Sequence, residues 1–447
     1  MQNYKVTVLG AGLAGCEAAW QAARRGVKVR LFEMKPAKFT PAHHSEKFSE
    51  LVCSNSLRSD STSNAVGLLK EEMRRMSSLI MEAADACRVP AGSALAVDRE
   101  AFSGYITDKI RSHPLIECVG EEVSSVPEGE LTVIATGPLT SKPMADYIAG
   151  ELGCSGLHFF DAAAPIVDGE TVDRNIAFFA SRYGKGDADY LNCPMTREQY
   201  DAFYDALVSA REAELHDFDR EEQKDLTVFE GCMPVEVMAR RGRDTLRFGP
   251  MKPVGLSDPR HPEVRDYYAV VQLRKENREG TMFNLVGFQT HLAFPEQRRV
   301  FSMIPGLENA EFLRYGVMHR NTYLDSPGKL DENYGLISRP GVYFAGQMTG
   351  VEGYVESAAS GLVAGMSAAR RALGRPAVVF PRETMTGAMA SYVAHGGEGG
   401  SFVPMNANFG IIAPLSERVR GGKKARGEAY AARALETLGT LLCGLDD

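Results

Sequence analysis

The sequence predicts an α/β fold in which a parallel sheet is assembled from both ends of the chain around an inserted α+β region. Near the N-terminus, an apolar run at residues 6–9 leads into a glycine-rich turn at residues 10–15. Near the other end, a second apolar run at residues 341–345 is followed by Gly346 and a helix of small residues. The region between them alternates in the manner of antiparallel strands. We therefore expect segments 1–186 and 326–447 to form one domain, with 187–325 inserted in it.

The first predicted element is a strand, a glycine-rich turn and a helix in immediate succession. Gly10 permits the turn, Gly12 has no side chain to keep a phosphate from the backbone, and Gly15 lets the following helix pack closely on the strand. The amides at such a helix N-terminus bind phosphate groups. The sequence therefore predicts a pyrophosphate site for a dinucleotide, formed by Gly10, Ala11, Gly12, Leu13, Ala14 and Gly15.

The second strand, residues 27–32, ends at Glu33, which lies 18 residues beyond Gly15. An acid at about this spacing accepts hydrogen bonds from the ribose hydroxyls of an adenosine. It favours a ribose with a free 2′-hydroxyl, as in FAD or NAD, over one that carries a 2′-phosphate. The alternative is that Glu33 only begins a loop.

Further elements follow before the insert. Residues 36–64 show weak periodicity and contain two adjacent histidines. A loop this long without a pattern of its own is usually functional or disordered. Residues 65–87 have the pattern of one amphipathic helix, and residues 98–111 have that of another. A buried strand at residues 131–134 then leads into Ala135, Thr136 and Gly137, where many flavoproteins pass their FAD a second time.

The C-terminal part supplies a strand that closes on Gly346 and Gln347, a glycine-rich turn and a helix of small residues over 357–369. Small residues allow tight packing, and the helix N-terminus can direct its dipole at a flavin ring or a phosphate. This end of the chain therefore indicates that the dinucleotide is a tightly held flavin. The expected contacts are Gly346, Gln347, Gly353, Tyr354 and Glu356.

The inserted region differs from the chain ends in its pattern of charged and apolar residues. Residues 196–219 predict a highly charged helix with spaced apolar positions. Alternating stretches at 246–248, 267–273 and 282–288 suit antiparallel strands.

Composition excludes several classes of protein. The chain of 447 residues is long enough for two or three domains. No apolar stretch approaches the ~20 residues of a membrane span, and the chain enters a strand without a signal peptide, so we expect a cytoplasmic protein with no membrane partner. The eight cysteines form no Cys-x-x-Cys pair and no histidine cluster accompanies them, so neither disulfides nor a metal are expected.

Two groups of cations stand out against a net charge of −8, which itself argues against indiscriminate binding of nucleic acid. One group contains Arg240, Arg241 and Arg243, and the other contains Lys423 and Lys424. A solvated surface explains either group alone. Both together permit a local face that binds RNA phosphates.

Several segments together resemble one known family; they are residues 10–15, 51–58, 229–236, 287–292, 319–323, 346–354 and 405–410. The glycine turn and the returning small-residue helix are similar to FAD-binding Rossmann domains of the glutathione-reductase type. Almost the whole chain resembles the folate- and FAD-dependent tRNA (uracil-5-)-methyltransferases. The resemblance implies that 5,10-methylenetetrahydrofolate supplies a methylene carbon and that FAD, reduced by NADPH or NADH, supplies reducing equivalents. The implied product is 5-methyluridine in the T-loop of tRNA.

This chemistry needs a reactive cysteine, because uracil C5 becomes nucleophilic once a thiolate has added to C6. Cys53 lies in a polar loop, with Arg58 near enough in sequence to stabilise a thiolate, and Cys232 lies in a turn ahead of the first basic group. The resemblance places the two functional cysteines at these positions. Our hypothesis is that Cys232 attacks the uridine and that Cys53 lines the flavin. The reverse assignment, and a buried structural thiol at either position, stay open.

The resemblance also implies that His291 stacks the pterin of the folate against the flavin, with Tyr354 and Glu356 facing the flavin ring. From the residues alone, an isolated histidine is more often structural.

Three other functions compete with this one. A flavin-dependent oxidoreductase of small molecules shares the cofactor frame but gives no use for the basic groups. A flavoprotein that binds RNA without turnover, and the same chemistry on ribosomal RNA, remain as alternatives.

Overall fold

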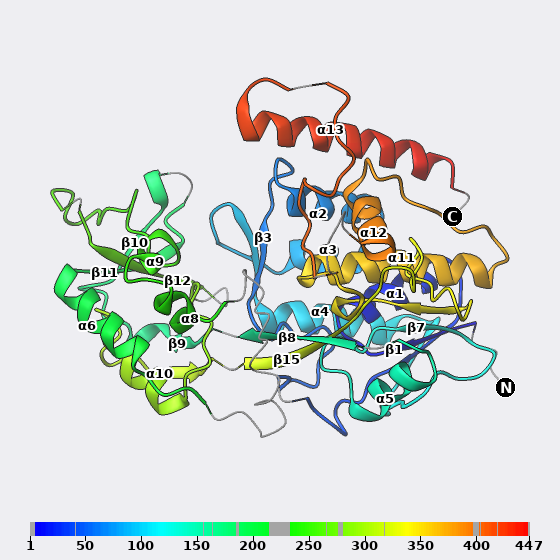
Figure 1. Cartoon of the computed structure of the whole chain (residues 1–447), viewed down its shortest axis with the longest axis horizontal. Helices are drawn as coiled ribbons and strands as arrows, with labels where there is room; N and C mark the ends of the chain where they lie inside the picture. The colour runs from blue at the N-terminus through cyan, green and yellow to red at the C-terminus, as the bar shows by residue number, and fades with distance from the viewer. Residues whose placement is uncertain are drawn as a thin grey trace.

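The computed structural model describes residues 5–40, 42–154, 156–162, 164–184, 187–213, 233–264, 266–275, 280–316, 318–396, 402, 404–417 and 419–445. Figure 1 shows two lobes, with the middle of the chain on the left and both chain ends on the right. The expected arrangement, in which one lobe is built from the two ends of the chain, is confirmed.

A parallel sheet forms the centre of the right-hand lobe. Over the described residues its strand order is β16-β7-β1-β2-β6. β16 comes from the C-terminal part of the chain and pairs in parallel with β7, so the far end of the chain completes the sheet. The strands are β1 (Val6–Leu9), β2 (Val29–Phe32), β6 (Ile116–Val119), β7 (Leu131–Ile134) and β16 (Val342–Phe344).

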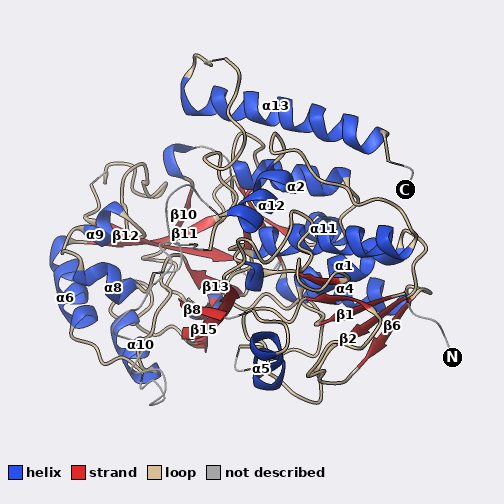
Figure 2. Cartoon of the chain, turned by 45° about the vertical axis from the view of Figure 1, so that its right-hand side comes forward, coloured by secondary structure: helices blue, strands red, loops and turns tan. Residues whose placement is uncertain are grey.

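Two helices pack tightly beside this sheet, α1 (Leu13–Ala23) and α11 (Tyr354–Ala372). An added Cβ at Gly361 would lie 2.2 Å from the carbonyl oxygen of Ala14, and one at Gly365 would lie 2.4 Å from that of Ala18. The small residues expected to pack this helix on the sheet thus pack it closely on α1 at these two glycines. In Figures 1 and 2 these helices lie above the sheet and α5 (Lys142–Gly150) lies below it.

The amphipathic stretch at residues 65–87 is two helices, so the expectation of one helix is wrong. α2 (Ala65–Arg75) ends before Ser77, whose φ of 57° interrupts the helix. Ser78 then caps α3 (Leu79–Ala86) by accepting a hydrogen bond from Met81 N. Apolar periodicity continues across the break because both helices pack on the same core.

An antiparallel sheet forms the left-hand lobe, with the order β10-β11-β12-β13-β9-β14 over the described residues. Its strands are β9 (Ile166–Asp168), β10 (Phe178–Ala180), β11 (Tyr190–Met195), β12 (Ala269–Lys275), β13 (Met282–Leu285) and β14 (Phe312–Arg314). The expected division at residues 187 and 325 stays a prediction, and the sheet itself already includes two strands that precede residue 187.

Two expected elements of this lobe differ in the structure. α6 (Arg197–Val208) ends well before residue 219, and residues 214–219 lie outside the described part of the chain. Residues 246–248 belong to the short helix α9 (Thr245–Phe248) and not to a strand. Three residues are too few to distinguish the period of a strand from that of a helical turn.

The remaining elements connect or cover the two sheets. β3-β5-β4 is a small sheet and β8-β15 is a two-stranded one. Within the described ranges, no helix combines the length and the apolar character that crossing a bilayer requires. These elements are β3 (Ser56–Ser59), β4 (Arg88–Val89), β5 (Ala94–Val97), α4 (Arg99–Ser112), β8 (Gly156–Ala162), α8 (Val235–Arg240), α10 (Phe294–Phe301), β15 (Met318–Leu324), α12 (Met385–His395) and α13 (Gly422–Cys443).

Candidate active site

One cavity collects most of the residues that the sequence predicts at a cofactor. It lies at the carboxyl ends of β1, β2 and β7, where the parallel sheet meets the N-termini of α1 and α11. Its empty volume, including solvent at its mouth, is about 1450 Å³. The predicted residues in its lining are Gly10, Ala11, Gly12, Leu13, Ala14, Glu33, Cys53, Ala135, Thr136, Gly137, Gly346, Gln347 and Tyr354.

The glycine turn has the geometry of an anion cradle. Gly10 has φ +96°, and a Cβ there would lie 2.6 Å from the carbonyl oxygen of Ala135. Gly15 faces inward instead, because its Cβ would lie 1.7 Å from the carbonyl oxygen of Gly10. At Gly12 an added Cβ would meet nothing within 4 Å, and no side chain caps the helix that begins after it. The first amides of α1 are thus open to a phosphate in the cavity.

Glu33 is held at the rim by the backbone on both sides. Its Oε2 accepts a hydrogen bond from Ala11 N at 2.8 Å, and its Oε1 accepts one from Lys35 N at 3.1 Å. Carboxylate oxygens have further acceptor capacity beyond these bonds. The carboxylate is thus placed beside the glycine turn, where the ribose hydroxyls of an adenine dinucleotide would donate to it.

The α11 end of the cavity is formed by Gly346, Gln347 and Tyr354. The amide of Gly346 donates to Ser360 Oγ at 2.7 Å, and Gln347 Nε2 donates to Glu352 Oε2 at 2.6 Å. These bonds fix the turn from β16 into α11. Three predicted cofactor contacts, Gly15, Gly353 and Glu356, are not part of the lining.

Glu356 is buried and forms an ion pair with Arg58, and its Oε1 also accepts a hydrogen bond from Ala407 N at 2.9 Å. The carboxylate therefore ties the loop of residues 51–58 to the C-terminal part of the chain. Its expected position facing the flavin ring stays a prediction.

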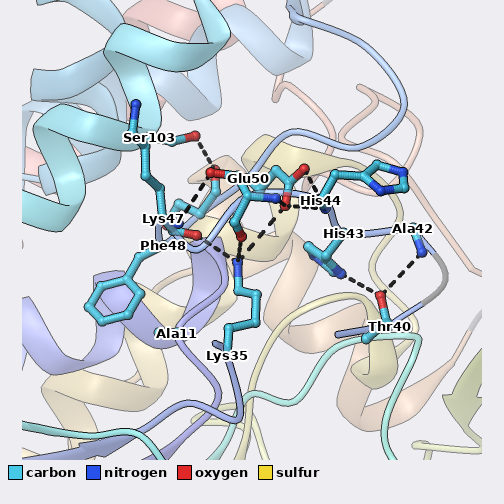
Figure 3. Close-up of polar contacts among 12 residues, drawn as sticks. Ala11, Lys35, Thr40, Ala42, His43, His44, Lys47, Phe48, Glu50 and Ser103 are labelled. Atoms are coloured by element: carbon cyan, nitrogen blue, oxygen red, sulfur yellow. Dashed lines mark hydrogen bonds and ion pairs between the residues drawn. The ribbon is translucent and has the colours of Figure 1, made fainter. Parts of the chain in front are cut away.

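One wall of the cavity is the loop after β2, drawn in Figure 3, and sequence reasoning did not name Lys35 or His43 as part of it. Lys35 is buried, and its Nζ donates to the carbonyl oxygens of Ser45 and Lys47 at 3.0 and 2.6 Å. Glu50 Oε2 lies 3.9 Å from the same Nζ. Lys35 thus folds the loop over the cavity. Its sequence signal was the long stretch without periodicity at 36–64.

His43 belongs to the same wall, and its Nδ1 lies 2.6 Å from Thr40 Oγ1. Burial, followed by the nearby Lys35 ammonium, lowers the pKa of His43. A neutral imidazole therefore lines the cavity at neutral pH.

Cys53 is the one cysteine of the described residues that lines the cavity. Its amide donates a hydrogen bond to Tyr354 Oη at 2.7 Å, and Tyr354 Oη donates to Cys53 Sγ at 3.2 Å. By contrast, Cys193 does not line the cavity, and burial raises its pKa to about 12, so the Cys193 thiol stays protonated. The other predicted cysteine, Cys232, lies outside the described residues.

His291 lies in the other lobe and is not part of the cavity lining. Its amide donates to Glu236 Oε1 at 2.7 Å, and its Nδ1 lies 3.7 Å from Glu212 Oε2. The neighbouring His291 side chain, together with the Arg240 guanidinium, lowers the pKa of Glu212 to about 2. The structure thus joins His291 to the first basic group and not to Cys53.

The basic residues expected at RNA differ in their surroundings. Arg240 forms an ion pair with Glu212 at 2.5 Å, and Arg243 forms ion pairs with Asp201 and Asp205 at 2.6 and 2.5 Å. These bonds neutralise much of the group.

The other predicted RNA contacts are more open. Arg241, between the two paired arginines, is exposed. Lys423 and Lys424 are exposed in the first turn of α13, where Lys424 lies 3.8 Å from Glu428. Arg420, Lys423 and Arg426 line a shallow hollow there.

The residues of the cavity fit an adenine dinucleotide. The open backbone at Gly12 suits a pyrophosphate, the pinned Glu33 suits a ribose, and a cysteine in the lining contacts Tyr354 at the N-terminus of α11. Within the described part of the chain, no group of three or more potential ligands gathers as a metal site. The arrangement can hold a redox dinucleotide beside a sulfur nucleophile.

Known proteins are similar to this chain in sequence and in fold. The model of the family described as glucose inhibited division protein A matches residues 5–376. The methylenetetrahydrofolate–tRNA-(uracil-5-)-methyltransferase TrmFO of Acetivibrio thermocellus is 59% identical over 433 residues, which is 97% of each chain. The protein of the same name from Heliobacterium modesticaldum is 60% identical over 97% of each chain. The form II crystal structure of Aquifex aeolicus GidA matches with a TM-score of 0.70 and 17% identity, covering 99% of this chain and 74% of that one.

Proposed function

Because the chain belongs to the glucose inhibited division protein A family and, within it, to the methylenetetrahydrofolate–tRNA-(uracil-5-)-methyltransferases, we propose that its cavity is the place where a tRNA uridine is methylated at C5. The carbon comes from 5,10-methylenetetrahydrofolate, and the tRNA uracil is the acceptor. The observation that carries the proposal for the site is that Cys53 lines the same cavity as the glycine turn. We place the target uridine in the T-loop.

FAD is the dinucleotide of this enzyme. When bound, it supplies the reducing equivalents that turn a transferred methylene into a methyl group, after reduction by NADPH or NADH. The amides at Gly12 hold its pyrophosphate and Glu33 holds its ribose in our proposal. Gly346, Gln347 and Tyr354 then surround its other end. Lys35 holds in place the loop that forms a wall of this cavity.

The protein must also make uracil nucleophilic, and cysteine chemistry serves this step. A thiolate that adds to C6 raises the electron density at C5, and the sulfur leaves again when the C5 proton has been removed. We propose Cys232 for this addition and Cys53 for the handling of the activated carbon or of protons beside the flavin, with the reverse assignment as the alternative. The position of Cys53 in the cavity supports its part of this assignment.

The substrates approach from the two lobes in this proposal. His291, between β13 and α10, would contact the folate, and the exposed cations of α13 and Arg241 would contact RNA phosphates. The uridine must leave its stack to reach the cavity. A cytoplasmic location follows from the tRNA substrate.

The deciding experiment combines the purified protein with FAD, NADPH, methylenetetrahydrofolate and unmodified tRNA, and measures 5-methyluridine by mass spectrometry of digested RNA. We expect the product at the T-loop position, and we expect Cys53→Ala and Cys232→Ala each to abolish it. Product on ribosomal RNA and not on tRNA would establish the alternative substrate. Oxidation of NADPH without any methylated RNA would contradict the proposal.

The two cysteines are separated by a second measurement, the covalent trapping of tRNA that contains 5-fluorouridine. We expect Cys53→Ala to form the trapped adduct and Cys232→Ala to fail. The opposite result would reverse the two roles.

A further inference from the structure

We propose that Arg314 of the inserted lobe and Tyr354 of α11 are positioning residues that hold the Cys53 side chain as a thiolate at the cavity. The reactivity of this cysteine would then depend on the contact between the two lobes. The inference deepens the proposed function, since it concerns the same cysteine. It can be tested on Cys53 itself, without folate or RNA.

Tyr354 directs its hydroxyl proton at the sulfur. Its oxygen accepts hydrogen bonds from Cys53 N at 2.7 Å and from Ser54 N at 3.3 Å. With both amides donating to the oxygen, the hydroxyl donates to Cys53 Sγ at 3.2 Å. Burial raises the pKa of Tyr354 well above its usual value, so the phenol remains a neutral donor at neutral pH. A donor fixed in this way stabilises the charged sulfur more than the thiol.

Arg314 adds positive charge from β14. Its Nη2 donates to the carbonyl oxygen of Val52 at 2.5 Å, and its Nε is buried without a hydrogen-bond partner among the described residues. Burial lowers the pKa of Arg314, followed by repulsion from Arg99, while Tyr354, Glu50 and Cys53 act in the opposite direction. A half-buried guanidinium with a buried Nε, paired with no carboxylate among the described residues, favours a neighbouring anion.

A second arginine reinforces this field. Arg99 of α4 donates from Nη1 to the carbonyl oxygen of Leu51 at 2.5 Å, next to the carbonyl that Arg314 holds. Two guanidinium groups therefore hold consecutive carbonyl groups just ahead of the cysteine. Glu50 is the acidic group close to them, and its oxygens already accept hydrogen bonds from the amides of His44 and Ser45.

Arg58, which sequence spacing favoured as the partner of the thiolate, has a different role. It forms an ion pair with Glu356 instead. Cations from outside the loop therefore take the place that Arg58 was expected to fill.

The inserted lobe grips this loop at another point, which provides a matched control. Arg274 of β12 donates from Nε to Asn55 Oδ1 at 3.0 Å and from Nη2 to Ser54 Oγ at 2.8 Å. It is a buried arginine on the same sheet and holds the same loop, but it is bonded to side chains beyond Cys53. Removal of Arg274 therefore disturbs the loop while the charge that Arg314 contributes beside Cys53 stays in place.

The experiment measures alkylation of Cys53 by iodoacetamide between pH 5.5 and 9.5 in the FAD-loaded full-length protein. Mass spectrometry of the peptide that contains Cys53 separates it from the other cysteines. We expect a wild-type midpoint below pH 7.5, against ~8.5 for a free cysteine. Arg314→Met and Tyr354→Phe should each raise the midpoint by about one unit, which is roughly a tenfold loss of alkylation at a fixed acidic pH. Arg314→Lys should restore part of the shift, and Arg274→Met should keep the wild-type midpoint.

Several outcomes would overturn the proposal. A wild-type midpoint at or above pH 8.5 would do so even if every variant failed to fold. Superimposable profiles for the wild type, Arg314→Met and Tyr354→Phe would also do so, as would an equal shift in Arg274→Met. Flavin absorbance reports whether each variant retains its fold. Because no turnover is measured, loss of methylation for another reason leaves this result unaffected.

Discussion

Glu72 Oε2 accepts two hydrogen bonds from Thr386, one from its amide at 2.8 Å and one from its hydroxyl at 2.7 Å. The other oxygen of Glu72 accepts a hydrogen bond from Met385 N at 2.7 Å. A buried carboxylate of α2 thus caps α12 from a distant part of the chain. This contact fastens the C-terminal segment to the cofactor lobe.

Glu72 should make stability depend on pH. Burial raises the pKa of Glu72 from 4.5 to about 7 in the folded protein. Because the folded pKa is above the unfolded one, the contribution is complete below pH 4.5 and is lost as the pH rises through 7. We expect the unfolding free energy of the wild type, relative to Glu72→Gln, to fall by up to about 3 kcal/mol between pH 5 and pH 8. Urea unfolding of both proteins at the two pH values measures this difference.

The comparison with Glu72→Gln removes the contribution of other titrating groups, because both proteins share them. A constant difference between the two proteins across this range would show that Glu72 is ionised or protonated throughout.

Gly12 should be required for the cofactor but not for the fold. An added Cβ meets no protein atom within 4 Å, so Gly12→Ala leaves the packing intact. The methyl group instead occupies the space where we place the pyrophosphate. We expect an affinity for FAD lower by at least about tenfold, with the unfolding midpoint of the apoprotein unchanged. Flavin fluorescence titration measures the affinity.

Gly150, at the end of α5, is a matched control, since a Cβ there also meets nothing within 4 Å. Gly150→Ala should bind FAD as the wild type does. If Gly12→Ala bound FAD with the affinity of the wild type, the glycine turn would not be part of the cofactor site.

The cofactor frame could be predicted because its signals are local. The spacing of Gly10, Gly12, Gly15 and Glu33 is set by one turn and one pair of neighbouring strands. The small residues of the C-terminal helix likewise predicted a close contact, and in the structure Gly361 makes that contact with Ala14. In each case a tight turn or a close approach requires a small residue at that position, so the residue type and its spacing predict the structure.

The partners of Cys53 could not be predicted in the same way. Tyr354 is 301 positions away from it, and Arg314 reaches the neighbouring Val52 across 262 positions. Local spacing favoured the nearby Arg58 as the partner of Cys53, but Arg58 forms an ion pair with Glu356, which is distant in the sequence. Such pairings depend on how β14 and α11 meet the loop, which no periodicity of the sequence encodes.

His291 should be separable from the flavin site. Its side chain lies outside the cavity lining, and its backbone amide is bonded to Glu236, so the substitution His291→Ala leaves that bond in place. If His291 contacts the folate, this variant should retain bound FAD but lose folate-dependent methylation by at least about tenfold. Flavin absorbance and the yield of 5-methyluridine are measured on the same preparation.

The exposed His395, which lies 3.3 Å from Glu332, serves as the control histidine. His395→Ala should match the wild type in both measurements. Bleaching of His291→Ala would show that this residue supports the flavin and not the folate.

RNA binding should depend more on α13 than on the arginines of the inserted lobe. Lys423 and Lys424 are exposed at the N-terminus of α13, whereas Arg243 is bound by Asp201 and Asp205. A cation that contacts a phosphate contributes about 0.7 to 0.9 to the slope of log affinity against log salt concentration. We expect the double variant Lys423→Ala, Lys424→Ala to reduce that slope by about 1.5, while Arg243→Ala changes it by less than about 0.5.

Fluorescence anisotropy with labelled tRNA at several salt concentrations measures both slopes. Lys142 is an exposed lysine of α5, and Lys142→Ala serves as the charge control. If Arg243→Ala reduced the slope as much as the double variant does, Arg243 would have to leave its carboxylates on binding, and the inserted lobe would be the main RNA surface.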